Sequence, residues 1–185
     1  MARRLVILDR DGVINHDSDE FIKSADEWQA IDGSLEAIGR LSSAGFDVAV
    51  ATNQSGIGRK LLDKPTLDSI HTKMRTLARE HGGHIDEVVY CPHHPDDGCD
   101  CRKPGTGLLT RLSRQYGQSL DGVPMIGDSL RDIEAARAVG GRPILVLTGN
   151  GDSTSKALAE QGIETETYAD LDEAVTALLA EVGAA

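Results

Sequence analysis

Two acidic residues near the start of the chain have the type and spacing to bind a metal ion and to exchange protons. The apolar run LVIL, residues 5–8, leads directly into Asp9 and Asp11. At an extended strand end, residues i and i+2 point to the same side, so two carboxylates would repel each other without a cation. Mg²⁺ prefers oxygen ligands of this kind. We expect a magnesium site here, which Asp128, at the end of another apolar run, can complete.

A second reactive group lies in CPHHPDDGCDCRKP, residues 91–104, which contains all 3 cysteines of the chain. A disulfide, a redox centre and a metal site are the alternatives. With an odd number of cysteines, any disulfide would leave one thiol unpaired. The sequence also lacks the Cys-x-x-Cys spacing that is typical of a redox pair. Thiols together with a histidine suit tetrahedral Zn²⁺ with a closed coordination shell, which is structural rather than catalytic. Iron stays open as an alternative metal.

The composition excludes several classes of protein. The chain has 30 acidic against 19 basic residues and a net charge of -11, which argues against a nucleic-acid-binding protein. An anionic ligand would need local cations to offset this field. No run approaches the roughly 18–20 apolar residues of a membrane span, and the apolar stretch before Asp9 is too short for a signal peptide. We expect a cytoplasmic monomer that binds neither membrane nor nucleic acid and keeps its thiols reduced.

Short apolar runs that alternate with helical patterns must position these groups. Buried parallel strands are predicted at residues 5–8, 48–52, 88–90, 123–127 and 144–148. Helical spacing of apolar residues predicts helices within 31–41, 67–77, 108–116, 133–139 and 171–182, and GNGDSTS, residues 149–155, is expected to be a polar loop. The alternation predicts one α/β domain over residues 1–185, with a doubly wound, Rossmann-like parallel sheet. Ligands of such sheets bind beyond the carboxyl ends of the strands.

The segments at these strand ends resemble, in order, the four motifs of the haloacid dehalogenase (HAD) superfamily of phosphatases. DRDGVIN is similar to the first motif, ATNQ to the second, Lys103 to the third and IGDSLRD to the fourth. The resemblance implies the HAD fold and a Mg²⁺-dependent phosphatase. Few residues separate Asp11 from the first helix, and no long insertion follows the third strand, so we expect a capless member.

The resemblance also implies a role for each motif residue. Asp9 is expected to be the nucleophile that forms an aspartyl-phosphate, and Asp11 the general acid and base. Mg²⁺ would be bound by the Asp9 carboxylate, the Asp11 backbone carbonyl and Asp128. Thr52 and Lys103 would bind the phosphoryl oxygens.

Further residues fall where the family contacts its substrate, and we expect substrate binding by Asp17, Ser18, Asp19, Glu20, Asn53, Gln54, Ser55 and Arg102. Ser129 is assigned to the same group, although some relatives have a lysine there, so one phosphate contact would be missing. Arg59 would either bind a second phosphate or be a solvated surface residue. Asp132 would either position the waters of the metal or carry a favourable charge in the first turn of a helix.

The cysteine segment is similar to one subgroup of the superfamily, in which Cys-x-His and Cys-x-Cys precede Arg-Lys-Pro. This resemblance implies a zinc loop over residues 91–103 with Cys91, His93, Cys99 and Cys101 as ligands, and His94 as the alternative to His93. Enzymes of the subgroup remove the 7-phosphate of a heptose 1,7-bisphosphate or hydrolyse histidinol phosphate.

Asn15, TNQSGIGR and GDSLRDIEAA favour the heptose branch, and the anomer stays open. The expected partner is therefore a small phosphorylated sugar. A zinc-bearing module that only stores phosphate on an aspartate is the alternative that is not an enzyme. Asp11 argues against it, because such a module has no use for an acid and base two residues after the acceptor.

Overall fold

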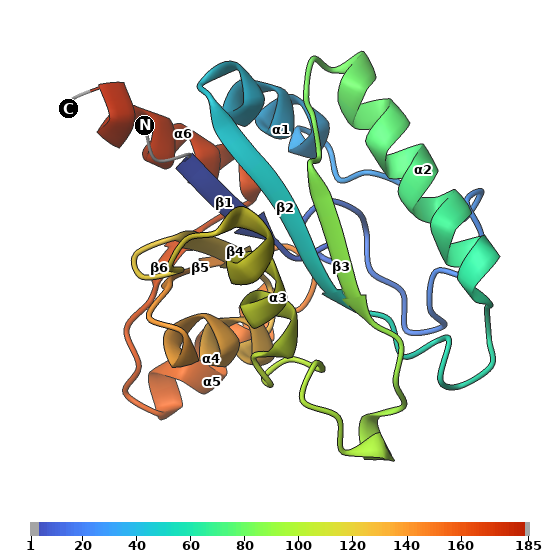
Figure 1. Cartoon of the computed structure of the whole chain (residues 1–185). Coiled ribbons are helices and arrows are strands. Elements are labelled where there is room, and N and C mark those ends of the chain that lie inside the picture. The colour runs from blue at the N-terminus through green and yellow to red at the C-terminus, as the bar shows by residue number, and fades with distance from the viewer. Residues whose placement is uncertain (1–3, 184–185) are drawn as a thin grey trace.

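A single parallel β-sheet forms the centre of the computed structural model, which describes residues 4–183. Within these residues the sheet has the order β3-β2-β1-β4-β5-β6 (Figure 1). Its strands are β1 (Arg4–Leu8), β2 (Phe46–Asn53), β3 (Glu87–Cys91), β4 (Pro124–Gly127), β5 (Arg142–Val146) and β6 (Glu166–Tyr168). The five predicted strands are confirmed as β1 to β5. The sequence did not predict β6, because this short edge strand is largely exposed and has no apolar run.

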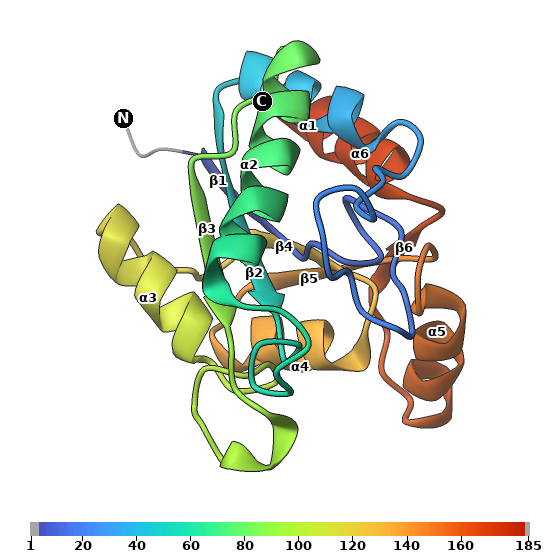
Figure 2. The ribbon, with the colours of Figure 1, turned by 90° about the vertical axis from the view of Figure 1, so that its right-hand side faces the viewer.

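Helices cover both faces of this sheet. They are α1 (Ser34–Ser43), α2 (Lys64–Glu80), α3 (Gly107–Tyr116), α4 (Leu130–Ala138), α5 (Gly151–Glu160) and α6 (Leu171–Gly183), with one short 3-10 helix, η1 (Pro95–Asp97). Residues of α1, α2 and α6 share one apolar core, and residues of α3 and α4 share the core of the opposite face. Figure 2 shows α3 on one side of the strands and α1, α2 and α6 on the other.

The expected polar loop over residues 149–155 is wrong, because α5 begins at Gly151. This helix buries only Gly151, Thr154 and Leu158 and exposes most of its polar residues, so a stripe of apolar residues could not reveal it. The helix predicted within residues 67–77 is confirmed as α2, which begins earlier, at Lys64. Asp63 caps this helix by accepting a hydrogen bond from the Thr66 N–H at 2.9 Å, and Pro65 lies in its first turn.

The position of β1 between β2 and β4 brings the predicted site residues together. Leu8 pairs in register with Val50 of β2 and with Ile126 of β4, and all three side chains are buried. The backbone N–H of Asp9 then donates to the Ile126 carbonyl at 2.9 Å. The three strands therefore end side by side, and the residues that follow them share one edge of the sheet.

Within residues 4–183, the connections at this edge are loops and one short 3-10 helix. Between β1 and α1, residues 9–33 contain neither an α-helix nor a strand, as expected for a capless protein. The segment between β3 and α3, with η1 inside it, projects from the carboxyl edge of the sheet (Figure 1). Among the described residues, no helix combines the length and the apolar character needed to cross a membrane.

Candidate active site

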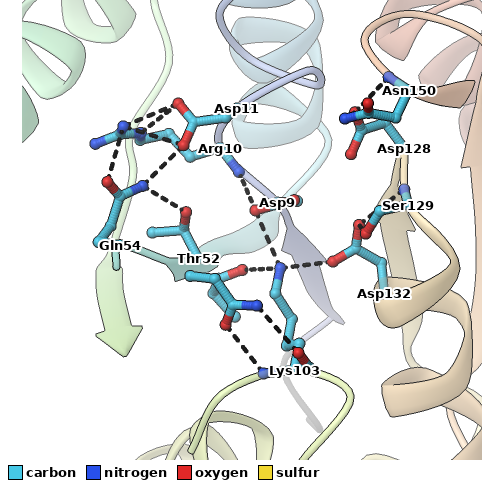
Figure 3. Close-up of polar contacts among 12 residues, drawn as sticks. Asp9, Arg10, Asp11, Thr52, Gln54, Lys103, Asp128, Ser129, Asp132 and Asn150 are labelled. Atoms are coloured by element: carbon cyan, nitrogen blue, oxygen red, sulfur yellow. Dashed lines mark hydrogen bonds and ion pairs between the residues drawn. The ribbon is translucent and has the colours of Figure 1, made fainter. Parts of the chain in front are cut away.

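Three carboxylates and one ammonium group meet at the carboxyl edge of the sheet. Oxygen atoms of Asp9, Asp128 and Asp132 lie within 4.8 Å of one another. The Lys103 Nζ lies 3.0 Å from Asp9 Oδ1 and 2.6 Å from Asp132 Oδ1 (Figure 3). Three ionised carboxylates and one ammonium group leave two negative charges, which one divalent cation would balance. Since Mg²⁺ prefers carboxylate oxygens, these residues fit a magnesium ion.

The electrostatics of this cluster also favour a cation. Burial and the neighbouring Asp132 raise the pKa of Asp9 well above its usual range, and burial raises the pKa of Asp128 to about 6. Burial alone would also raise the pKa of Asp132, but the attraction of Lys103 lowers it. The pKa of Lys103 is raised, because Asp132 and Asp9 outweigh the effect of burial. Without a metal ion the cluster therefore tends to retain a proton on Asp9 or Asp128.

Asp128 is held from several sides. Its Oδ2 accepts hydrogen bonds from the backbone N–H of Asn150 at 2.8 Å and from Asn150 Nδ2 at 3.1 Å, and its carbonyl accepts from the Thr154 hydroxyl at 2.8 Å. Gly12 has a φ of 80° and lies against the carboxylate, which a Cβ atom would overlap. Sequence reasoning missed Asn150 and Thr154, which belong to the segment expected to be a loop.

Lys103 is held through its backbone as well as its ammonium group. The side chain of Asn53 accepts a hydrogen bond from the Lys103 N–H at 2.9 Å and donates one to the Lys103 carbonyl at 3.1 Å. The Lys103 Nζ also donates to the Ala51 carbonyl at 2.7 Å. Both polar atoms of the Asn53 side chain thus contact the loop. Its expected contact with substrate stays a prediction.

The side chain of Asp11 lies apart from the three carboxylates. It accepts hydrogen bonds from Arg10 Nη2 at 2.8 and 3.1 Å and from Gln54 Nε2 at 2.8 Å (Figure 3). Asn15 Nδ2 donates a further hydrogen bond to it at 2.9 Å. Burial alone would raise the pKa of Asp11, but Arg10 and these hydrogen bonds lower it. Arg10 thus pairs with the Asp11 side chain. The expected Mg²⁺ ligand from Asp11 is its backbone carbonyl, and this assignment stays a prediction.

Thr52 and Ser129 are the two hydroxyl side chains next to these charged groups. Its hydroxyl is buried and accepts a hydrogen bond from Gln54 Nε2 at 2.9 Å. A hydroxyl that accepts one bond can still donate its own proton, so Thr52 can bind an oxyanion next to Asp9. Ser129 is the N-cap of α4, and its hydroxyl donates to Asp132 Oδ2 at 2.6 Å. This bond fits the capping interpretation of Asp132, whose other oxygen reaches Lys103.

A polar pocket of about 190 Å³ opens over the cluster. It is lined by the predicted residues Asp9, Asp11, Asp17, Ser18, Thr52, Asn53, Gln54, Ser55, Arg102, Lys103, Asp128, Ser129 and Asp132. Phe21, Ile22, Arg131 and Asn150 also line it and were not predicted. Asp19, Glu20 and Arg59 do not line it. Asp19 borders a neighbouring hollow, and the exposed Arg59 lies over the Phe21 ring, 5.6 Å from its centre.

The cysteine segment folds its thiols into one cluster. Ligand atoms of Cys91, His93, Cys99 and Cys101 lie within 4.8 Å of one another. The Nδ1 atom of His93 is 3.1 Å from Cys101 Sγ and 3.5 Å from Cys91 Sγ. This donor set fits a tetrahedral zinc ion. His94 lies outside this group of four, and its Nδ1 instead accepts from the Asp96 N–H and caps η1.

Comparisons with known proteins agree with this geometry. A family described as polynucleotide kinase 3 phosphatase matches residues 4–135, and one described as HAD-hydrolase-like matches residues 100–174. A protein of Pseudomonas aeruginosa named D-glycero-beta-D-manno-heptose-1,7-bisphosphate 7-phosphatase is 52% identical over 97% of this chain and 99% of its own length. A protein of the same name from Pseudomonas putida is 52% identical over 89% of this chain and 91% of its own.

A solved structure shares the fold closely. The D,D-heptose 1,7-bisphosphate phosphatase of Bordetella bronchiseptica, complexed with magnesium and phosphate, is 50% identical and superposes with a TM-score of 0.92. The match covers 96% of this chain and 99% of that one. Sequence, fold and site therefore agree, and the chain belongs to the HAD-like phosphatase family.

Proposed function

We propose that the chain is a Mg²⁺-dependent phosphatase that removes the 7-phosphate from D-glycero-β-D-manno-heptose 1,7-bisphosphate. The observation that carries this proposal is the contact of Lys103 with Asp9 beside Asp128, on the floor of a polar pocket. The names of relatives at 52% identity support the sugar and its β anomer. The product would feed the synthesis of nucleotide-activated heptose for surface polysaccharide such as lipopolysaccharide.

The first half of the reaction transfers the phosphoryl group to the protein. An oxygen of Asp9 attacks the phosphorus atom, and the bond to the sugar oxygen breaks. Lys103 and the Thr52 hydroxyl bind the phosphoryl oxygens as their charge shifts. Asp11 gives a proton to the leaving sugar oxygen. In the described conformation Arg10 binds the ionised Asp11 carboxylate, and its charge helps to lower the pKa of Asp11. Asp11 must therefore take up a proton from solvent and turn from Arg10 toward the leaving group before this step.

The second half regenerates the free carboxylate. Asp11, now ionised, takes a proton from a water molecule that attacks the phosphorus of the aspartyl-phosphate. The bond to the Asp9 oxygen breaks, and inorganic phosphate leaves. A bound Mg²⁺ would reduce the repulsion between Asp9 and the phosphate. Asp9 and Asp128 would hold it with their carboxylates and Asp11 with its backbone carbonyl.

The second phosphate of the substrate needs cations at the rim of the pocket. Arg102 and Arg131 both line it, and Nη1 of Arg102 is buried with no hydrogen-bond partner among the described residues. Burial and the nearby Arg131 lower the pKa of Arg102, as expected for two cations without an anion between them. We assign these arginines to the 1-phosphate, and Asp17 and Ser18 to the sugar hydroxyls.

A zinc ion at the cysteine cluster would affect catalysis indirectly, by holding the segment that carries Arg102 and Lys103. Cys101 is followed directly by Arg102 and Lys103, so a zinc ion bound to Cys101 fixes the start of the segment that carries both cations. The three thiols, with no disulfide between them, fit a reducing compartment. We therefore keep the expectation of a cytoplasmic monomer that acts on a small substrate. Sedimentation of the purified protein would test the oligomeric state.

A steady-state panel tests the proposed substrate. Phosphate release would be measured with the α and β anomers of the heptose bisphosphate and with histidinol phosphate, and phosphorus NMR would identify the phosphate removed. We expect the highest kcat/KM for the β anomer and loss of the 7-phosphate. A preference for histidinol phosphate would assign the chain to the other branch. Turnover by Asp9→Asn equal to that of the wild type would contradict the enzyme mechanism itself.

A further inference from the structure

Arg10 is almost completely buried behind the site and contacts three side chains. It is 1% exposed. Its Nε and Nη2 donate to Asp11 Oδ1 at 3.0 and 2.8 Å, and its Nη2 lies 3.2 Å from Gln54 Oε1. Its remaining nitrogen, Nη1, lies 3.2 Å from the Nε2 atom of His71. His71 is therefore the side chain that contacts the end of the guanidinium group opposite Asp11.

His71 reaches this position from a distant part of the chain. It lies on the inner face of α2, 61 residues after Arg10, and is 7% exposed. Its ring packs against Tyr90 of β3, with ring centres 5.9 Å apart. The mechanism above gives His71 no task, although a polar ring in this place costs free energy unless it is paired.

The chemistry of the contact fixes the protonation of the ring. A guanidinium group donates hydrogen bonds and cannot accept them, so the Nε2 atom that faces it must carry a lone pair. A neutral ring then has its proton on Nδ1. Burial, followed by the charge of Arg10, lowers the pKa of His71 to about 3. The opposing charges of Asp11 and Asp68 do not reverse this shift, so the ring stays a neutral acceptor at neutral pH.

We infer that His71 is a positioning residue, whose Nε2 anchors the Arg10 guanidinium and thereby controls the placement of the Asp11 carboxylate. This inference rests on the proposed function, in which Asp11 must turn from Arg10 toward the leaving oxygen. An anchored guanidinium stays in place while the carboxylate turns. An unanchored guanidinium can move with the carboxyl group and keep its hydrogen bonds to it, which holds the carboxyl group away from the leaving oxygen.

The state of the ring can be measured without any turnover. Proton–nitrogen NMR of the intact protein, loaded with zinc, distinguishes protonated from unprotonated ring nitrogens. We expect the His71 ring to be neutral at neutral pH, with the proton on Nδ1 and none on Nε2. A proton on Nε2 would overturn the inference. This measurement uses the wild-type protein without substrate, so it depends neither on the substrate assignment nor on the folding of a variant.

A matched pair of substitutions tests the effect on catalysis. His71→Gln keeps an acceptor at a similar distance, and His71→Met has similar size but only a weak acceptor. With a generic phosphate ester and Mg²⁺, we expect His71→Met to lower kcat by about tenfold with KM within about twofold of the wild type. His71→Gln should retain kcat within about threefold. Equal losses in both variants, or wild-type kcat in His71→Met, would overturn the inference.

A double-mutant cycle separates positioning from general damage to the fold. If His71 acts through Arg10 and Asp11, His71→Met should cause no further loss of kcat in an Asp11→Asn background. An equal loss in both backgrounds would show a purely structural role and would contradict the inference. Because the generic ester replaces the heptose, failure of the sugar assignment leaves this test intact.

Discussion

Replacing Asn53 by alanine tests whether a side chain at the end of β2 places the active-site lysine. Asn53 makes two hydrogen bonds to the backbone of Lys103, at 2.9 and 3.1 Å. A hydrogen bond contributes a net 0.5–1.5 kcal/mol, so Asn53→Ala should lower the free energy of unfolding by about 1–3 kcal/mol. The same loss frees the segment that carries Nζ, which lies 3.0 Å from Asp9 Oδ1.

A shift of the Lys103 ammonium group should appear in kcat. A misplacement on the order of 1 Å in a catalytic constellation costs about 10²-fold in rate. The contacts of Nζ with the Ala51 carbonyl and with Asp132 remain, so we expect a smaller loss in kcat, about 10- to 50-fold, with little change in KM. Steady-state kinetics and thermal unfolding measure the two effects. Calorimetric Mg²⁺ titration should give unchanged affinity, because Asn53 contacts none of the three carboxylates.

Two outcomes would refute this reasoning. Wild-type kcat in a destabilised Asn53→Ala protein would show that Ala51, Asp9 and Asp132 place Lys103 without help. A rise in KM at constant kcat would instead indicate that Asn53 contacts the substrate directly, as its motif suggests. Asn53→Asp retains an acceptor for the Lys103 N–H but replaces the donor with a charged oxygen that repels the Lys103 carbonyl. If the hydrogen bond to that carbonyl places the lysine, Asn53→Asp should also lower kcat.

Three further predictions follow from the two metal sites. Cys101→Ala should lose zinc and most activity through misplaced Lys103, while calorimetric Mg²⁺ affinity is largely kept; full activity in the zinc-free variant would show that zinc does not position the lysine. Asn150→Ala removes one hydrogen bond to Asp128 and should weaken Mg²⁺ binding by up to about tenfold without changing zinc content. The pKa of Asp128 in the folded protein, about 6, exceeds its value in the unfolded chain, so the metal-free protein should lose stability as pH rises from about 4 to 6. Because this proton competes with the metal, Mg²⁺ should raise Tm more at about pH 7.5 than at about pH 5. An equal rise in Tm at both pH values would show that this proton does not compete with the metal.

The sequence was sufficient to predict which residues meet, because topology does most of this work. Asp9, Thr52 and Asp128 lie at the ends of three apolar runs, and parallel strands end at the same edge of their sheet. Only the order of the strands remained to be determined, and β1 proves to lie between β2 and β4. The cluster of Cys91, His93, Cys99 and Cys101 was expected from the resemblance of the cysteine segment to one subgroup of the superfamily, and the structure brings these four side chains together.

The direction of individual side chains could not be predicted in this way. Strand periodicity placed Asp11 beside Asp9, but the buried Arg10 between them turns the second carboxylate away. His71 meets Arg10 only in the folded protein, and Asn53 turns its amide to a loop 50 residues away. Such pairs leave no local pattern. Arg10 shows this most clearly, because arginine is usually a surface residue but here it is 1% exposed and binds Asp11.

The charge of the whole chain explains why the site needs more than its lysine. The net charge is -11, and a phosphate ester adds further negative charge to a pocket that already contains carboxylates. The ammonium group of Lys103 lies against Asp9 and Asp132, so much of its attraction for an anion is already offset. Among residues 4–183, Arg102 and Arg131 are the cations that line the pocket besides Lys103, and a Mg²⁺ ion at Asp9 and Asp128 would add further positive charge. Binding of the transferred phosphate and binding of the metal should therefore depend on each other, while the second phosphate depends on Arg102 and Arg131.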